Sequence, residues 1–209
     1  AAVLNYLLLL GWAPEGEQEI FSLDEMIKIW DPSRISKSPA IFDPLKLRAI
    51  NAAYIRALPA EEFRRLADPF IDSAVHCDID RDLLCANLQP RCEVLEDIPP
   101  QLDFFDAVLP IDAEMYRNKK QKTTPESAKE ALTALLPVLE AQTDWTRDAI
   151  FEACKTLAEQ MEKKNGWLLF PLGIALSGKA RTPGGGTDLA AMMGKAETLK
   201  RVKDALGKL

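Results

Sequence analysis

The stretch TPESAKEALTALLPVLEAQ, residues 124–142, indicates the class of fold. Strong helix formers stand in it between apolar residues spaced three and four positions apart, which is the spacing of one helix face. Thr124 precedes Pro125, an order typical of a first helical turn, and Glu126 and Glu130 complement the positive end of the helix dipole. The stretch therefore predicts a capped amphipathic helix.

Helical periodicity also describes most of the remaining chain, so we predict an all-α fold built from helical bundle subdomains. Ser22, followed three residues later by Glu25, forms a capping signal for one helix. The pair Asn165-Gly166 is expected to stop another. The expected helices span residues 2–10, 21–30, 45–54, 60–67, 81–94, 124–142 and 146–161, followed by an apolar helix, a glycine-rich connection, a short helix and a last helix over about 196–206.

The composition is that of an ordinary globular chain. Its 209 residues, 47% of them hydrophobic, can bury one good-sized core or two or three small ones. The apolar run over residues 3–12 has about half the length that crosses a bilayer and no basic region before it, so we expect neither a membrane span nor a signal peptide. The sequence opens on Ala1 and Ala2 without a methionine, as a segment of a longer protein would.

Cysteine and histidine usage argues against a metal site and against a catalytic triad. Cys77, Cys85, Cys92 and Cys154 include no C-x-x-C pair, and His76 is the single histidine of the chain. A chain of this length does not need disulfides for stability. We therefore expect free thiols in a reducing cytosol, a cytoplasmic location, and no bound metal.

The net charge of −6 excludes a protein that coats nucleic acid by charge alone, so any RNA contact must come from local basic patches. The densest patch lies in the segment YRNKKQK, residues 116–122, and a second lies in the C-terminal tail. Such patches are more often solvent-exposed surface than binding sites. Their basic residues are Arg117, Lys119, Lys120 and Lys122 in the first, and Lys195, Lys200, Arg201, Lys203 and Lys208 in the second.

The segment RISKS, residues 34–38, is similar to the KMSKS signature of class I aminoacyl-tRNA synthetases. That signature acts together with a HIGH-type motif and a nucleotide-binding α/β domain, because phosphates need helix N-termini and glycine-lined loops around them. The chain contains neither. We therefore interpret RISKS as a solvent-facing connection between helices.

Two further segments raise the question of a phosphate or cation site. TPGGGTD, residues 182–188, is glycine-rich but lacks the Walker lysine and the G-x-G-x-x-G spacing, so its glycines indicate a sharp turn or a close backbone approach. Asp78, Asp80 and Asp82 alternate, but the other ligands of a calcium loop are missing. Helix capping and surface charge explain these aspartates better. The residues by themselves therefore predict no enzyme active site.

Three longer stretches resemble bacterial glutamyl-tRNA synthetases in their order and spacing. In residues 1–58, the strings LNYLLLLGW, EIFSLDEMI, RISKSPAIFD and N-x-x-YIR resemble the end of the stem-contact domain of that family. LQPRCEVLEDIPPQLDFF, residues 88–105, resembles the first anticodon-binding subdomain. The string PLGIALSGKARTPGGGTDLAAMMGKAETLKRVKDAL, residues 171–206, resembles the end of the second. The resemblance covers nearly the whole chain.

The resemblance implies a division into the end of a stem-contact domain (1–58), a first anticodon-binding subdomain (59–103) and a second one (104–209). The helices would form a cage around the anticodon loop of tRNA(Glu). The parent enzyme would attach glutamate to this tRNA using ATP and magnesium, whereas this chain would carry no catalytic domain and no cofactor. We expect a monomer.

The resemblance also implies roles for individual residues. Arg91 matches an arginine that reads the third anticodon base, because a guanidinium has fixed donors that distinguish a cytosine edge from a guanine edge. Gln89 is the alternative occupant of that place. Thr182 and Pro183 match a pair that contacts anticodon bases, while the tRNA backbone would lie on the first basic patch. Gly173 departs from the pattern, since many relatives have arginine there, and this predicts an altered or relaxed reading of the first base.

Two alternatives stay open at this level. A synthetase of the non-discriminating type would also charge tRNA(Gln), and only the tRNA preference separates the two types. A non-catalytic helical protein descended from the synthetase would bind protein partners instead of RNA. A gel shift with tRNA(Glu) and an anticodon-mutated control would distinguish that case.

Overall fold

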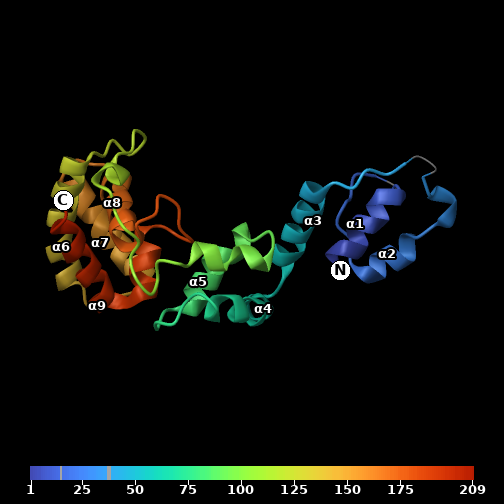
Figure 1. Ribbon diagram of the computed structural model, residues 1–209, viewed down its shortest axis with the longest axis horizontal. Coiled ribbons are helices and arrows are strands. Elements are labelled where there is room, and N and C mark those ends of the chain that lie inside the picture. The colour runs from blue at the N-terminus through green and yellow to red at the C-terminus, as the bar shows by residue number, and fades with distance from the viewer. Residues whose placement is uncertain (15, 37–38) are drawn as a thin grey trace.

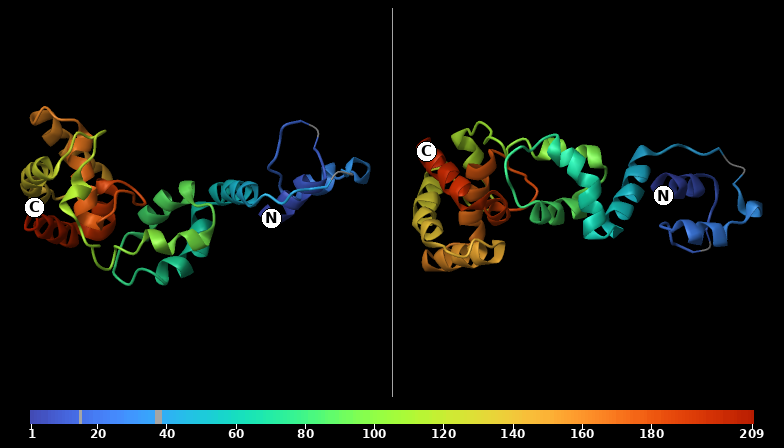
Figure 2. Two further views of the ribbon diagram at one scale, coloured as in Figure 1. Left: turned by 45° about the horizontal axis from the view of Figure 1, so that its top comes forward. Right: turned by 90° about the horizontal axis from the view of Figure 1, so that it is seen from below.

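The computed structural model describes residues 1–14, 16–36 and 39–209 and consists of helices joined by loops. The helices follow one another along an elongated shape, with the N-terminal helices at one end and α6 to α9 at the other (Figure 1). Two further views confirm that these groups of helices lie at opposite ends (Figure 2). Among the described residues, β-type pairing is confined to two isolated bridges, Trp12–Ile35 and Asn118–Thr123. The predicted all-α class is confirmed.

The N-terminal end contains α1 (Ala2–Gly11) and α2 (Leu23–Ile29). α2 begins with the capping box that the sequence predicts. The Ser22 hydroxyl oxygen accepts the Glu25 N–H at 3.2 Å, and the Glu25 carboxylate accepts the Ser22 N–H at 2.6 Å. This reciprocal bonding satisfies two backbone donors that a helix leaves unpaired, and the backbone donor of Ser22 lowers the pKa of the Glu25 carboxyl.

A buried asparagine holds the N-terminal helices together. Asn5 is fully buried, and its Nδ2 donates to the Glu19 carbonyl at 2.8 Å. Its Oδ1 accepts the Phe21 N–H at 2.8 Å and the Tyr54 hydroxyl at 2.9 Å. The Asn5 side chain thus joins α1, the segment before α2, and the helix that contains Tyr54. A small apolar cluster of Ala2, Tyr6 and Ile50 packs in the same unit.

The middle of the molecule contains α3 (Pro44–Ala57), α4 (Ala60–Asp72) and α5 (Arg81–Leu88). α5 ends at Leu88, earlier than its apolar pattern predicts, and a 3₁₀ turn over Gln89–Arg91 follows. Pro90 accounts for the difference, because proline has no N–H to donate to the carbonyl four residues before it.

The C-terminal end is a bundle of α6 (Pro125–Ala141), α7 (Arg147–Gln160), α8 (Asn165–Ser177) and α9 (Gly186–Leu206). Thr124 caps α6, as predicted, and Thr146 caps α7. The Asn165-Gly166 pair, predicted to stop α7, instead begins α8. The predicted short and final helices are the two parts of α9, which meet in a kink at Gly194, where a φ of +77° favours glycine.

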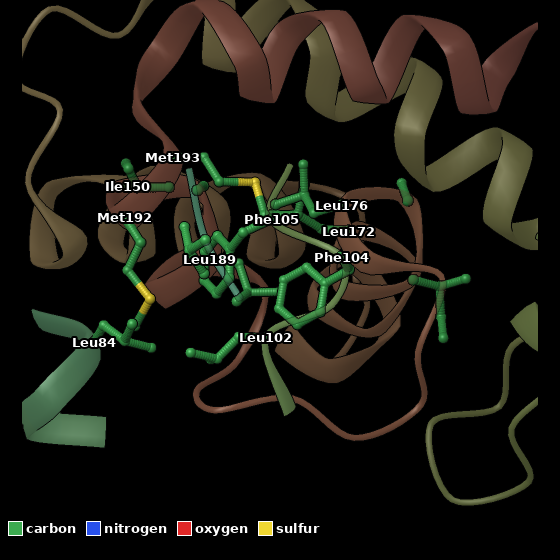
Figure 3. Packing of buried hydrophobic residues seen from close by; sticks show 14 of the residues in the cluster. Leu84, Leu102, Phe104, Phe105, Ile150, Leu172, Leu176, Leu189, Met192 and Met193 are labelled. Atoms are coloured by element: carbon green, nitrogen blue, oxygen red, sulfur yellow. The ribbon is translucent and has the colours of Figure 1, made fainter. Parts of the chain in front are cut away.

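One hydrophobic core runs through the middle of the molecule and the C-terminal bundle. Phe104 and Phe105, in the connection before α6, stack with ring centroids 4.5 Å apart and lie in this core (Figure 3). Around them, Leu172 and Leu176 of α8 and Leu189 of α9 point into the same space (Figure 3). The core continues without a break from the middle of the molecule into the bundle.

The prediction that Arg201 of α9 lies in a basic surface patch is wrong. The charge pattern of the C-terminal tail indicated an exposed side chain, but only 2% of the surface of Arg201 is exposed. Its guanidinium donates to the carbonyls of Phe104 and Leu176, both at 2.7 Å, and of Phe105 at 2.5 Å. Its Nε also donates to the Glu197 carboxylate at 2.7 Å. Arg201 therefore joins α9 to the end of α8 and to the buried aromatic pair.

The N-terminal unit also presents an exposed apolar groove. Its lining residues come from α1 and α2 and include Leu7, Leu23, Ile27 and Trp30, each about half exposed or more. No helix among the described residues is long and apolar enough to span a bilayer.

Candidate nucleic-acid interface

An open cavity of about 500 Å³ lies between α7, α8 and the loop that leads into α9. Arg91, from the 3₁₀ turn after α5, lines the same cavity. Figure 1 shows the loop between α8 and α9 reaching toward the chain that follows α5. The cavity therefore forms where the middle of the molecule meets the C-terminal bundle.

The glycine-rich loop forms one wall of the cavity. Gly184 has a φ of +106°, which favours glycine, and a Cβ on Gly186 would lie 2.7 Å from the Leu169 carbonyl oxygen of α8. The Asp188 carboxylate accepts the Gly185 N–H at 2.7 Å and so caps α9. The sequence interpretation of a sharp turn with close backbone approach is confirmed.

Arg91 and Thr182 meet although they are far apart in the sequence. Arg91 is exposed, and its Nη1 donates to the Thr182 carbonyl with a separation of 3.4 Å. The Thr182 hydroxyl donates to the Gly184 carbonyl at 2.7 Å. Arg91 and Thr182 both line the cavity, whereas Pro183, the residue after Thr182, is buried and does not line it. The structure thus places Arg91 and Thr182 together at the cavity wall.

Gln89 lies outside the cavity. Its Nε2 donates to the carbonyls of Ile55 at 3.0 Å and Leu58 at 2.8 Å, which are at the C-terminal end of α3. These bonds add a side-chain donor to carbonyls at the end of the helix, of which that of Ile55 also accepts the Leu58 N–H at 3.2 Å. Of the two candidates for the base-reading position, Arg91 is the one whose side chain borders open space.

The opposite wall contains two residues that sequence reasoning missed. Arg147 and Phe151 of α7 both line the cavity, and the Arg147 guanidinium carbon lies 5.6 Å from the centre of the Phe151 ring. Arg147 Nε also donates to Asp188 at 3.3 Å. The four-residue spacing on a helix was visible in the sequence. Only the packing of α7 against the loop before α9 shows that the pair borders a cavity.

Positive charge predominates among the side chains that line the cavity. The positive charges are those of Arg91, Arg147, Lys179 and Arg181, and the acidic residue of the lining is Asp188. Arg181 is exposed and has no ion-pair partner within the described ranges. A chain with an acidic net charge therefore has a locally basic cavity, as base and phosphate recognition requires.

The predicted basic patch borders this cavity through one residue. Arg117, Lys119, Lys120 and Lys122 are all exposed, on the turn closed by the Asn118–Thr123 bridge. Gln121 of the same turn lines the cavity. Arg117 is engaged by the Glu114 carboxylate at 2.7 Å, which raises the pKa of its guanidinium.

The two rejected motifs lie elsewhere. Arg34 of RISKS stacks over the Trp12 ring at 5.1 Å in the N-terminal unit, while Lys37 and Ser38 lie outside the described residues. Asp80 caps α5 by accepting the Leu83 N–H at 2.9 Å, which confirms the capping role expected of the alternating aspartates.

Most of the chain matches a known protein family. Residues 47–206 match the model of a family described as "Anticodon binding domain", which is more than half of the chain. The chain belongs to the anticodon-binding domain family. The resemblance to glutamyl-tRNA synthetases is confirmed by relatives over the whole chain, and the cavity lies within the matched residues.

Several relatives of this anticodon-binding domain are glutamate–tRNA ligases. The ligase of Clostridium botulinum is 45% identical over 208 residues, covering 100% of this chain and 43% of the relative. The ligase of Clostridium acetobutylicum is 43% identical over 209 residues, again covering 43% of the relative. The chain thus spans less than half the length of these relatives.

A solved structure has the same fold. The glutamate tRNA ligase from Elizabethkingia meningosepticum, determined in complex with its amino acid, matches with a TM-score of 0.85 and 27% identity. The match covers 100% of this chain and 41% of that one. The helical arrangement around the cavity is therefore that of a segment of such a ligase.

Proposed function

We propose that this cavity binds the unpaired anticodon nucleotides of a tRNA, as the RNA-reading part of a glutamate–tRNA ligase specific for tRNA(Glu). The observation that carries the proposal is the cavity itself. It joins guanidinium groups, an aromatic ring and exposed loop backbone in one open space. Proteins read RNA sequence mainly in single-stranded loops, by stacking splayed bases and bonding their edges with such groups.

The distribution of charge supports RNA as the ligand. The chain as a whole is acidic, but the cavity lining is basic, and the exposed basic turn at residues 117–122 adjoins it. A nucleotide bound in the cavity would leave its neighbouring phosphates near this turn. We propose that Arg117, Lys119, Lys120 and Lys122 contact the tRNA backbone there, since phosphate contacts position RNA without reading its sequence.

The chemical step belongs to the rest of the proposed ligase. ATP and magnesium would be bound there, and this chain would contribute tRNA binding to the attachment of glutamate. Within the described ranges, no group of three or more His, Cys, Asp or Glu side chains is placed to hold a metal ion. We propose that the cavity acts by binding and selecting RNA.

Replacing Arg91 with glutamine tests the proposed function. We expect a loss of about 1 to 3 kcal/mol in binding to a tRNA whose anticodon ends in cytosine, the scale of one lost base-edge pair. The expected loss is smaller for a guanine-ending anticodon, because the Watson–Crick edge of guanine offers a donor-only guanidinium one acceptor, whereas that of cytosine offers two. Fluorescence anisotropy with both tRNAs measures the two values.

Arg65→Gln is the matched control, because Arg65 is 67% exposed on α4 and bonds to Glu62 on its own helix. Its affinity for both tRNAs should equal that of the original chain. An unchanged preference in the Arg91 variant would contradict the assignment of Arg91. Failure of the original chain to bind either tRNA would instead favour a helical protein that binds protein partners.

The same titration separates the two types of ligase. Arg91 supports discrimination in favour of tRNA(Glu), while Gly173 lines the cavity where the family resemblance leads us to expect an arginine. We propose tRNA(Glu) as the main partner. Comparable affinity for tRNA(Gln) would identify the non-discriminating type.

We also propose that the chain is a monomer. We propose in addition that its subdomains meet at residues 58 and 103. The exposed apolar groove over α1 and α2 is the surface from which self-association would begin. Sedimentation equilibrium is expected to give a single species of 23.2 kDa. A dimer would contradict the monomer. Cleavage sites of limited proteolysis that cluster away from residues 58 and 103 would contradict the division.

A further inference from the structure

The cavity wall formed by α7 has a feature that base reading by Arg91 does not use. Arg147 and Phe151 are one helical turn apart, and the guanidinium lies over the ring at 5.6 Å from its centre. Both side chains line the cavity. A planar guanidinium supported by an aromatic ring is a surface on which a nucleobase can stack.

The acidic residues around Arg147 hold it in place. Its Nε donates to Asp188 at 3.3 Å, and its Nη1 donates to Asp148 at 2.7 Å. Asp188 is itself fixed, because its other carboxylate oxygen accepts the Gly185 N–H at 2.7 Å and only 15% of its side chain is exposed. The guanidinium is therefore oriented before any ligand arrives, which reduces the entropy that binding would cost.

The facing wall has few groups that could distinguish one base from another. Gly173, Gly184, Gly185 and Gly186 line it and carry no side chain. Two polar side chains of this wall are already engaged, since the Thr182 hydroxyl donates to a loop carbonyl and Asp188 accepts from two donors. Edge reading needs free donors and acceptors at fixed positions. The glycine-lined part of the loop therefore offers few side-chain groups for edge reading.

We propose that Arg147, supported by Phe151, is a stacking platform that binds one nucleobase of the RNA without selecting its identity. This inference rests on the proposed function and assigns a second, permissive subsite beside Arg91. Stacking tolerates any base, because every base has a π-face. The cavity then reads one base by its edge at Arg91 and holds another by its face at Arg147.

Binding of anticodon stem-loop RNAs tests this subsite. The RNAs carry the loop of tRNA(Glu) with each anticodon nucleotide replaced in turn by an abasic residue or by the other three bases. We expect one position at which the four bases bind within about threefold of one another and an abasic residue weakens binding about 10-fold. In Arg147→Ala, the intact loop should bind about 10-fold more weakly, and the abasic residue at that position should cost nothing further.

Two variants and a control separate stacking from charge and from folding. Arg147→Lys keeps the positive charge without the planar group, and Phe151→Leu keeps the apolar support without the ring; both are expected to weaken binding in the same position-specific way. Lys155→Ala changes an exposed lysine of the same helix that pairs with Glu152 at 3.0 Å, and should bind as the original chain does. Thermal melting confirms that each variant is folded.

The outcomes are distinct. An abasic penalty that stays the same in Arg147→Ala and Arg147→Lys would overturn the platform, as would discrimination of more than about 10-fold between bases at every position. Either result leaves tRNA binding through Arg91 intact. Absence of binding by any of the loops would instead overturn the proposed function.

Discussion

Replacing Arg201 with methionine is expected to lower the free energy of unfolding by about 3 to 5 kcal/mol. Methionine keeps an unbranched, flexible side chain but lacks the guanidinium, so the substitution removes the donors to three carbonyls, those of Phe104, Phe105 and Leu176. Each carbonyl left without a partner in the core costs about 1 to 3 kcal/mol. Urea unfolding followed by circular dichroism measures the change.

Lys200→Met is the matched control for this prediction. Lys200 precedes Arg201, is 67% exposed, and pairs with the same Glu197 at 3.3 Å. Its replacement should change stability by no more than about 0.5 kcal/mol. A similarly small change in Arg201→Met would show that water or rearrangement satisfies the three carbonyls, and would contradict the role assigned to Arg201.

Replacing Asn5 with leucine is expected to destabilise the N-terminal unit by about 3 kcal/mol. Leucine has the same branched arrangement of side-chain heavy atoms but removes the acceptor for the Phe21 N–H and the donor to the Glu19 carbonyl. The apolar cluster of this unit is separate from the main core. The loss should therefore appear locally, as faster hydrogen exchange in α1 by about 100-fold with little change in α6 to α9.

Leu4→Ala provides the comparison within the same helix, because Leu4 is 52% exposed and lies one position before Asn5. We expect its effect on the exchange of α1 to be much smaller. Uniform acceleration throughout the molecule in Asn5→Leu would show that the N-terminal unit and the bundle unfold together. No acceleration in α1 would contradict the structural role of Asn5.

Helix positions were largely predictable because they depend on local features. The capping boxes at Ser22 and Thr124 are formed by residues three positions apart, so their sequence signal is complete. The end of α5 was predicted too late, because the apolar pattern continues past Pro90 while the backbone cannot. The Asn165-Gly166 pair was misinterpreted as a stop because the same residues can follow one helix or begin the next.

The candidate site was only partly predictable. Resemblance to a family pointed to Arg91 and Thr182, and the structure places these residues side by side, but their role in base reading stays a prediction. Arg147 and Phe151 were missed, since an arginine and a phenylalanine one turn apart occur on many surface helices. Arg201 was misplaced on the surface, because a local charge pattern cannot show which basic residue meets unpaired carbonyls.

The sequence by itself determined the all-helical class, most helix starts, the turn in the glycine-rich loop and the family. These features follow from interactions between residues close in the chain, or from long ordered matches. Tertiary structure decided where the cavity lies and which charges line it. It brings α5, α7, α8 and the loop before α9 together, and the physical reason is that burial of one shared apolar core fixes the distances between residues distant in sequence.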